Sequence, residues 1–374
     1  MEHDEQQMLM LPYYHGMLLS EDAEEFLLFD GNFLVRKTEE ISDDGRVFAL
    51  SVNVAGRVSH VVFRRRRHEG MEGMYTIEGN PEGFLTIEQF VNNYLGTGTS
   101  IISGQSIFLR RPIERAGWEI SRDAITLDRG GFVVFTPRKP GKKIRVTVKE
   151  MSQTSSKERI REFMHEMRIL RQLNHRNIIQ FHGVALQHEP LMMVIEDIEE
   201  ATALTDYLRT QRRCVRAKLN MCLGAAGGLS HIHSRGIVHG DIAARNCIYL
   251  RSRRKVKISN FEMAFKGTAK MYDIKWTQRK WLSPELQIDG LFTSVSDTWS
   301  YGVLCWEIFH DGNEPYPQME GREIARLIQN GGGPTFSNET PPTIVEFFKQ
   351  FVLSRRSERY SMESVYEWLK QNIN

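Results

Sequence analysis

Residues 237–248 read IVHGDIAARNCI, and this stretch decides the fold. A short apolar run leads into a polar loop, and a second apolar run, from Cys247 to Leu250, leads out of it. This pattern predicts a loop held between buried segments, where a fixed carboxylate can meet a substrate. Asp241 is followed five positions later by Asn246. Phosphoryl transfer can use this spacing, because the carboxylate receives the proton of an attacking hydroxyl and the amide oxygen helps to hold a metal ion. The alternative is a turn in which both side chains only bond the local backbone.

The stretch resembles the catalytic loop of protein kinases, H-R-D-x-x-x-x-N, with the A-A-R of the tyrosine-specific branch. Eight residues agree, which favours a catalytic loop over a simple turn. The resemblance implies that Asp241, Arg245 and Asn246 are catalytic and that Asn246 is a Mg²⁺ ligand. The sequence departs from the family at Gly240, which stands where the family has Arg.

Length and composition restrict the possible classes of protein. A chain of 374 residues is too long for one ordinary hydrophobic core and predicts two or three domains. Its net charge of +2 argues against nucleic acid as a partner. The four cysteines form no C-x-x-C pair, which predicts reduced thiols in the cytosol. No apolar run approaches membrane-spanning length, and the acidic N-terminus is not a signal peptide. We therefore expect a cytoplasmic protein that reaches membranes only by recruitment through partners.

The first hundred residues predict a small sheet between two amphipathic helices. Residues 1–12 show little periodicity and are predicted to be a loose lead-in. The predicted elements are a helix at 20–29 capped by Ser20, strands at 33–36, 47–52 and 57–63, and a second helix at 85–95. Arg36 stands inside an apolar strand, where a guanidinium is costly unless it meets a dianion or a buried carboxylate.

Residues 13–111 resemble an SH2 domain, with a Tyr-His-Gly start, a Phe-Leu-Val-Arg strand and an Ile-Phe-Leu-Arg end. The resemblance implies that Arg36 clamps the phosphate of phosphotyrosine and that Thr38 and His60 flank it. Ser20 replaces a second Arg that many members have, and four acidic residues lie between positions 39 and 44. We therefore expect weak phosphotyrosine binding. The alternative is that Arg36 forms an internal salt bridge.

Residues 112–117 are short and polar, contain Pro and Gly, and predict a linker. An SH2 domain, the W-x-I of residues 118–120 and a tyrosine-kinase domain, in this order, resemble the Fer/Fes group of non-receptor tyrosine kinases. The resemblance implies an α+β protein, in which the SH2 domain is followed over residues 118–374 by a bilobal kinase-like domain with a β-rich N-lobe and a helical C-lobe. The implied partners are phosphotyrosine-containing proteins and, if the domain is active, protein substrates.

The resemblance also implies the residues that bind ATP. Lys149 would contact the phosphates and pair with Glu166 on a helix that begins at residue 157. Backbone groups near Glu196 and Ile198 would contact the adenine. Tyr272 lies midway along the activation segment, where tyrosine kinases are often phosphorylated, and a plain exposed tyrosine is the alternative.

Further along, the resemblance implies structural partners for the site. Asp297 would brace the backbone of the catalytic loop, and Arg359 would pair with Glu285 of the A-P-E motif.

The nucleotide side departs from the family at several positions. Residues 125–134 predict a tight hairpin in place of a G-x-G-x-x-G loop. Thr147 replaces the alanine that packs on adenine, and Asn260 and Glu262 replace the Asp and Gly of D-F-G. Asn260 matters most, because Mg²⁺ is a hard cation and a neutral amide oxygen is a poorer ligand than a carboxylate. We therefore expect weakened binding of ATP and Mg²⁺.

Two functions follow from these patterns. The first is a signalling adaptor that binds phosphotyrosine and whose ATP-dependent tyrosine phosphorylation is impaired, as in a pseudokinase. The alternative is an active cytoplasmic tyrosine kinase that transfers the γ-phosphate of ATP to tyrosine. The changes in the nucleotide motifs converge on Mg²⁺ and ATP and favour the first function.

Overall fold

The structure is a computed structural model of the 374-residue chain. It describes residues 2–42, 45–66, 73–127, 133–135, 144–151, 156–198, 200–271 and 276–373. The chain forms two compact units. The first unit comprises Met1–Met164 and His182–Val194, and the second comprises His165–Phe181 and Ile195–Asn374. The division falls inside helix α4 (Lys157–Leu170).

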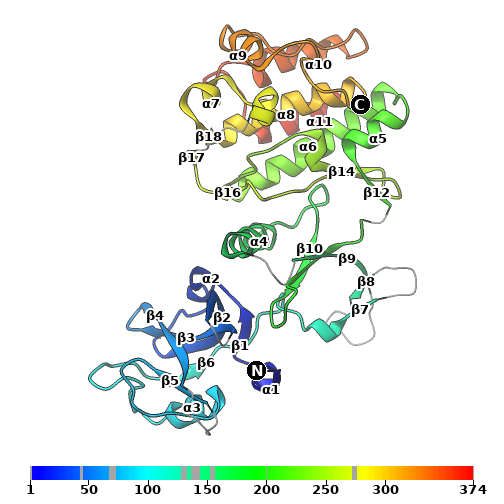
Figure 1. Ribbon diagram of the computed structural model, residues 1–374. Coiled ribbons are helices and arrows are strands. Elements are labelled where there is room, and N and C mark those ends of the chain that lie inside the picture. The colour runs from blue at the N-terminus through cyan, green and yellow to red at the C-terminus, as the bar shows by residue number, and fades with distance from the viewer. Residues whose placement is uncertain are drawn as a thin grey trace. The chain divides into compact units, whose positions relative to one another are not determined.

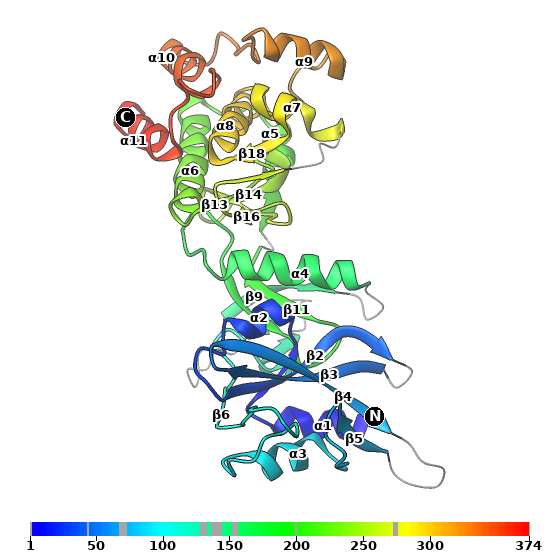
Figure 2. The ribbon, with the colours of Figure 1, turned by 90° about the vertical axis from the view of Figure 1, so that its left-hand side faces the viewer.

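The N-terminal part of the first unit is a sheet with a helix on each face, as predicted (Figures 1 and 2). The strands follow the order β1-β2-β3-β4-β5, and β6 pairs with β2. Their bounds are β1 Tyr14–Met17, β2 Asn32–Ser42, β3 Gly45–Val54, β4 Arg57–Arg66, β5 Met74–Ile77 and β6 Arg111–Pro112. The helices are α2 (Ser20–Glu24) and α3 (Ile87–Tyr94). The core between them is apolar, and Phe33, Val35 and Phe90 are fully buried.

The hairpin of β3 and β4 fixes which polar side chains meet across the sheet. Its turn residues Ala55 and Gly56 have φ of 50° and 87°, and positive φ at both positions suits the tight turn that follows the strand twist. The resulting register sets Ser51 opposite His60.

Two sequence-based expectations in this part are wrong. Residues 2–10 form helix α1 rather than a loose lead-in. Met8 and Leu11 are 4% and 6% exposed and join the core beside Ile87, so tertiary packing stabilises a segment with little periodicity of its own. The first long helix ends early, at Glu24, and its N-cap is Leu19 rather than Ser20.

A second sheet holds the strand that carries Lys149. Its order is β10-β11-β9-β8-β7. The bounds are β7 Ile125–Leu127, β8 Val133–Phe135, β9 Ile144–Glu150, β10 Phe181–Ala185 and β11 Met192–Glu196. The antiparallel pairing of β7 with β8 confirms the predicted hairpin. Residues 128–132, the rest of the predicted glycine-loop replacement, lie outside the described residues.

Backbone hydrogen bonds tie the two sheets of the first unit together around the linker. The N–H of Met17 donates to the carbonyl of Leu186 at 2.8 Å, and the N–H of Ile120 donates to the carbonyl of Val184 at 3.0 Å. The predicted SH2 segment and the sheet that carries Lys149 are therefore packed together within the first unit.

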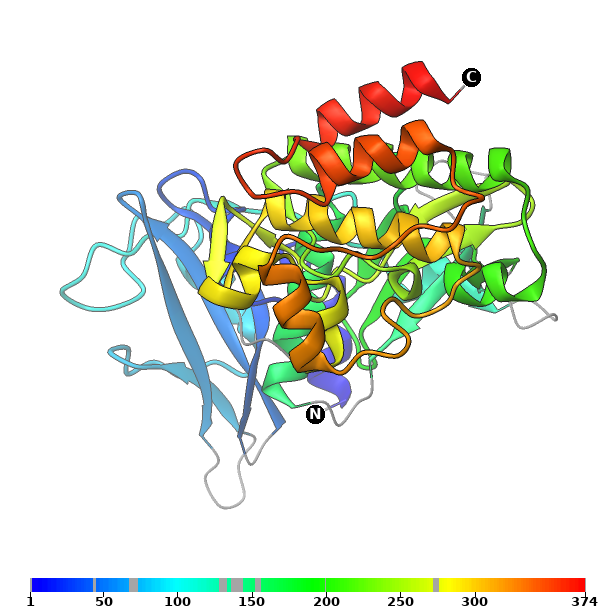
Figure 3. The same cartoon turned by 90° about the horizontal axis from the view of Figure 1, so that it is seen from above.

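The second unit is mainly helical (Figures 1 and 3). Its helices are α5 Leu204–Thr210, α6 Val215–Ser234, α7 Pro284–Asp289, α8 Ser294–Phe309, α9 Gly321–Gln329, α10 Pro342–Phe347 and α11 Met362–Asn372. Three short sheets complete it: β12 (Ala201–Ala203) with β14 (Cys247–Leu250) and β15 (Lys255–Ile258), β13 (Ile237–Val238) with β16 (Phe265–Lys266), and β17 (Ala269–Met271) with β18 (Leu291–Thr293). Helix α8 is buried from Ser296 to Phe309 and forms the centre of this unit. The β-rich and helical parts confirm the predicted α+β class.

None of the helices in the described part of the chain is both long enough and apolar enough to cross a membrane.

Candidate active site and phosphotyrosine site

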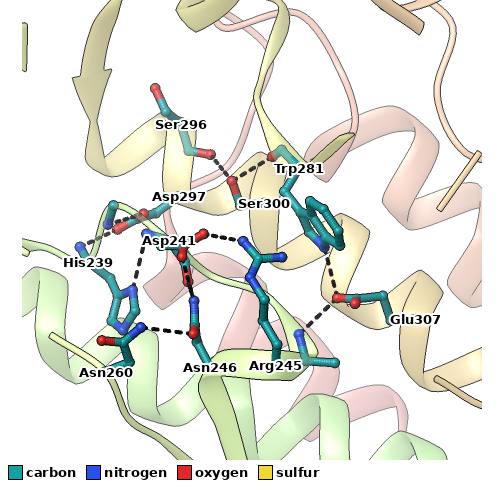
Figure 4. Close-up of polar contacts among 12 residues, drawn as sticks. His239, Asp241, Arg245, Asn246, Asn260, Trp281, Ser296, Asp297, Ser300 and Glu307 are labelled. Atoms are coloured by element: carbon teal, nitrogen blue, oxygen red, sulfur yellow. Dashed lines mark hydrogen bonds and ion pairs between the residues drawn. The ribbon is translucent and has the colours of Figure 1, made fainter. Parts of the chain in front are cut away.

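The catalytic loop is anchored by one buried carboxylate. Asp297, on helix α8, accepts the backbone N–H groups of His239 at 2.7 Å and Gly240 at 3.0 Å, and bonds Nε2 of His233 at 3.0 Å. Figure 4 shows Asp297 beside the backbone of His239. The predicted brace is therefore confirmed. It fixes the backbone where β13 ends and the polar loop begins.

Gly240 suits its position for steric reasons. Its φ is +82°, and a Cβ built there would lie 2.9 Å from the carbonyl oxygen of Met263. Left-handed backbone is costly for residues with a side chain, so the local geometry favours the glycine that replaces the family's Arg.

The three predicted catalytic residues meet at one carboxylate (Figure 4). Arg245 donates from Nη2 to Oδ1 of Asp241 at 2.6 Å. Asn246 donates from Nδ2 to Oδ2 of Asp241 at 2.7 Å and to its backbone carbonyl at 2.8 Å. The guanidinium of Arg245 also lies 4.2 Å from the ring centroid of Trp281. Both oxygens of Asp241 are therefore held in place.

Sequence analysis missed Glu307, which supports this loop from helix α8. Its Oε2 accepts the N–H of Ala244 at 2.9 Å and Nε1–H of Trp281 at 3.0 Å. Burial raises the pKa of Glu307 to about 7, although these two bonds oppose the rise. A carboxylate inside the apolar run VLCWEIF was the signal available in the sequence.

Asn260 bonds directly to the predicted metal ligand. It has a φ of 61°, a left-handed conformation that asparagine tolerates better than most residues. Its Nδ2 donates to Oδ1 of Asn246 at 3.0 Å. The two donations to Asp241 fix the orientation of the Asn246 amide, so Oδ1 is its acceptor atom. The oxygen that would bind Mg²⁺ therefore already accepts one amide N–H group.

These residues suit a Mg²⁺ ion less well than an Asp at position 260 would, because an amide oxygen carries no negative charge. A carboxylate at position 260 would place two oxygen acceptors together, and a cation between them would relieve their repulsion. An amide supplies the donor instead and satisfies the pair without a cation.

The predicted nucleotide-contacting residues are distributed over both units. Lys149 lies on β9 in the first unit, and Glu166 lies on α4 in the second. Their predicted pairing stays a prediction, as do the adenine contacts near Glu196 and Ile198. Tyr272 lies outside the described residues.

Glu196 also has a structural role within the second unit. Its side chain accepts the N–H of Gln180 at 2.7 Å and pairs with Nζ of Lys257 at 2.6 Å. Its own N–H donates to the carbonyl of Gln180 at 2.9 Å. The side chain and the backbone N–H of Glu196 therefore both hold the C-terminal end of β11 in place.

The predicted pair of Glu285 and Arg359 is present. Arg359 donates from Nη1 at 2.5 Å and from Nη2 at 3.1 Å to the two carboxylate oxygens. Burial raises the pKa of Glu285, but Arg359 more than offsets this effect and the pKa is lowered overall.

Arg36 is 4% exposed, and its guanidinium is fixed by neutral groups. It donates from Nη1 to the carbonyl of Leu18 at 2.8 Å and from Nε to Oγ of Ser51 at 3.1 Å. Ser51 in turn bonds Nδ1 of His60 at 2.8 Å. Ser51 therefore links two predicted phosphotyrosine-binding residues, and sequence analysis missed it because the link depends on strand register. Thr38 accepts the N–H of Glu40 at 3.2 Å and shapes the adjoining loop.

Acidic side chains surround the Arg36 site. Burial lowers the pKa of Arg36, and the charges of Glu39, Glu21, Asp22 and Glu24 oppose this effect. The pKa of His60 is lowered by burial and by the charge of Arg36, although Glu24 lies 3.4 Å from its Nε2. These carboxylates repel a dianion, so the site attracts a phosphate less strongly than Arg36 would without them.

Two features define the class of this protein. Asp241 is held by Arg245 and Asn246 in an anchored loop, as in a protein kinase. Arg36 lies on a strand like that of an SH2 domain. Comparison with protein families agrees. Residues 129–369 match the family described as protein tyrosine and serine/threonine kinase, and residues 13–94 match the SH2 domain.

Individual relatives narrow the family. The chain is 32% identical over 369 residues to Fer-related kinase 1 of Caenorhabditis elegans, covering 96% of this chain and 93% of that protein. It is 30% identical over 329 residues to tyrosine-protein kinase Fer of Homo sapiens, covering 85% of this chain and 39% of that protein. The chain belongs to the Fer/Fes family of SH2-containing non-receptor tyrosine kinases.

Proposed function

We propose that this protein is a signalling protein that docks on phosphotyrosine through the Arg36 site and whose ATP-dependent tyrosine phosphorylation is impaired. Its family uses ATP and Mg²⁺, acts on protein substrates and, through SH2 domains, binds phosphotyrosine-containing partners. The observation that carries the proposal is the 3.0 Å hydrogen bond from Asn260 Nδ2 to Asn246 Oδ1.

The physical reason is charge. Phosphoryl transfer depends almost wholly on positioning and on neutralising charge at the phosphates. A neutral amide at position 260 removes one negative charge from the ion's surroundings, and its N–H group occupies the remaining amide oxygen. The loss therefore falls on the largest contribution to catalysis.

A specific observation favours the second candidate, an active tyrosine kinase. Asp241 is held by Arg245 at 2.6 Å and by Asn246 at 2.7 Å, so its carboxylate is oriented as a proton acceptor requires. In this function Asp241 would receive the proton of a substrate tyrosine hydroxyl. Asp241 as an intact proton acceptor favours phosphoryl transfer, whereas Asn260 at the metal position disfavours it.

Labelled-phosphate transfer from ATP to a tyrosine-containing polymer separates the two functions. We expect the natural chain to match an Asp241→Asn control and Asn260→Asp to exceed both. Transfer by the natural chain that disappears in Asp241→Asn would establish the active kinase instead. The four cysteines are free, which supports the additional proposal of a cytoplasmic protein that partners recruit to membranes.

A further inference from the structure

Two segments of the second unit carry much of the positive charge of the chain. Residues 204–216 and 249–257 together contain nine Lys and Arg residues and one Asp, whereas the net charge of the whole chain is +2. The first segment covers α5 and the start of α6, and the second is the β14–β15 hairpin. Helix α5 packs against β14, so the two segments form one surface.

Three arginines of this surface surround a stacked pair of tyrosine rings. The ring centroids of Tyr207 and Tyr249 are 3.8 Å apart, with 18° between the ring planes. The guanidinium carbon of Arg213 lies 3.9 Å from the centroid of Tyr207, and that of Arg251 lies 5.9 Å from it. Burial and the neighbouring Tyr207 raise the pKa of Tyr249 to about 12, and the charges of Arg213 and Arg254 oppose the rise. Arg213, Arg251 and Arg254 are called the arginine cluster below.

Two of the three arginines in the cluster carry exposed charge, and the third, Arg213, is half-buried. Arg251 and Arg254 are exposed, and neither forms an ion pair with a carboxylate among the residues that the structure describes. Glu196, at the end of β11, lies 3.8 Å from the neighbouring Arg253 and is paired with Lys257 at 2.6 Å.

Two features indicate that the cluster is a binding site: the side chain of Arg213 is ordered, and Arg254 has an unusual backbone conformation. Arg213 is held in place, because it donates to the carbonyl of Tyr207 at 3.2 Å and to Oγ1 of Thr210 at 3.0 Å. A guanidinium that is already ordered loses less entropy when it binds. Arg254 has a φ of +51°, a backbone conformation that favours Gly or Asn. A role for the charge of Arg254 would account for an arginine at this strained backbone position.

We propose that the arginine cluster docks an acidic segment of a partner polypeptide, with successive Asp or Glu carboxylates paired to its guanidinium groups. The planar guanidinium matches the geometry of a carboxylate. Cations spread around two rings on an exposed surface suit an extended, multivalent chain rather than one small anion. An anionic membrane suits the surface less well, because Val215 is the one large apolar side chain that the two segments expose and insertion needs several.

The location of the cluster relates it to the candidate active site. Strand β14 begins directly after Asn246, and β15 ends two residues before Asn260. The cluster turn and the active site therefore lie at opposite ends of one hairpin, about 13 Å apart for four residues of strand. Docking there requires no phosphoryl transfer, so the inference does not depend on the proposed function.

The test uses the full chain and a fluorescent, tyrosine-free peptide that alternates Asp and Glu, with an Asn/Gln peptide as its uncharged match. We expect binding of the acidic peptide that weakens as salt is added. Replacing Arg251→Gln and Arg254→Gln together should weaken it roughly three- to tenfold. The matched control is the double variant Arg322→Gln and Arg326→Gln, two exposed residues of α9, which should bind as the natural chain does.

A single variant separates charge from structure. Arg254→Gly removes the cation and relieves the left-handed backbone, so it should raise the melting temperature while weakening the acidic peptide's binding. Equal binding by Arg254→Gly and the natural chain would overturn the proposal. Absence of binding by the natural chain would also overturn it, as would binding to phosphatidylserine vesicles without binding to the peptide.

Discussion

His15 and Glu119, which are 104 positions apart in the sequence, form a fully buried hydrogen-bonded pair. Nδ1 of His15 lies 3.0 and 2.9 Å from the two carboxylate oxygens, and its Nε2 lies 3.0 Å from the carbonyl oxygen of Ile113. Glu119 also accepts the N–H of Ala116 at 2.9 Å. The pair joins strand β1 to the segment that follows β6, inside one compact unit.

Removing one member of this pair should destabilise the whole first unit. Glu119→Ala removes the hydrogen-bond partner of both Nδ1 of His15 and the N–H of Ala116 in a buried site, so we expect the free energy of unfolding to fall by about 2–5 kcal/mol. Chemical denaturation of the intact chain measures this fall. Glu114→Ala, at an exposed position five residues before Glu119, is the control and should change stability by less than about 0.5 kcal/mol. A fall no larger than that of the control would show that the pair has no structural role.

Phosphotyrosine binding should depend on Ser51 as well as on Arg36. Arg36→Ala should abolish binding to a phosphotyrosine peptide. Ser51→Ala leaves Nε of Arg36 without its partner, and we expect affinity to fall by about tenfold, the equivalent of one hydrogen bond to a charged group. Fluorescence anisotropy with phosphorylated and unphosphorylated peptides measures both effects. Unchanged affinity in Ser51→Ala would contradict the role of Ser51.

Mg²⁺ should contribute little to nucleotide binding by the natural chain. Because an amide N–H group occupies Oδ1 of Asn246, we expect ATP with Mg²⁺ and ATP with a chelator to give equal thermal shifts. In Asn260→Asp, the shift should be larger with Mg²⁺ than with the chelator. A thermal shift that depends on Mg²⁺ in the natural chain would contradict the proposal that the bond between Asn260 and Asn246 disfavours Mg²⁺ binding.

The raised pKa of Glu307 should make the stability of the protein depend on pH. Its pKa in the folded state is about 7, raised from 4.5 by burial. The unfolded chain therefore loses this proton first, and stability falls as the pH rises from about 4.5 to 7 and stays low above it. The contribution is about 3 kcal/mol.

The matched variant for this effect is Glu307→Gln, which keeps an oxygen acceptor for Ala244 and Trp281. The stability of the variant relative to the natural chain should rise by about 3 kcal/mol between pH 4.5 and 8. Denaturant titrations across this range measure the difference. A difference that is constant with pH would mean that Glu307 does not titrate there.

A side chain at position 240 should be costly. Gly240→Ala places a Cβ 2.9 Å from the carbonyl oxygen of Met263 at a φ of +82°, so we expect a loss of about 1–2 kcal/mol from backbone strain alone. Gly117→Ala is the control, because nothing lies within 4 Å of its added Cβ. If both variants have the same melting temperature, the strain argument fails.

The sequence by itself determined the elements whose signals are local. The run IVHGDIAARNCI predicted the catalytic loop, and the Phe-Leu-Val-Arg strand predicted the SH2 domain, because each resembles a short motif of a known family. The same local reasoning missed helix α1, because its stability comes from Met8 and Leu11 in a core assembled by distant residues.

Only the tertiary structure decided the contacts on which function depends. The substitution at Asn260 was visible in the sequence, but its bond to Asn246, fourteen residues away, follows from the pairing of β14 with β15. Strand register likewise brings Ser51 to Arg36, and helix packing brings Glu307 to the catalytic loop. Hydrogen bonds are short-ranged and directional, so the identity of a polar residue predicts its chemistry, and only its folded neighbours fix its partner.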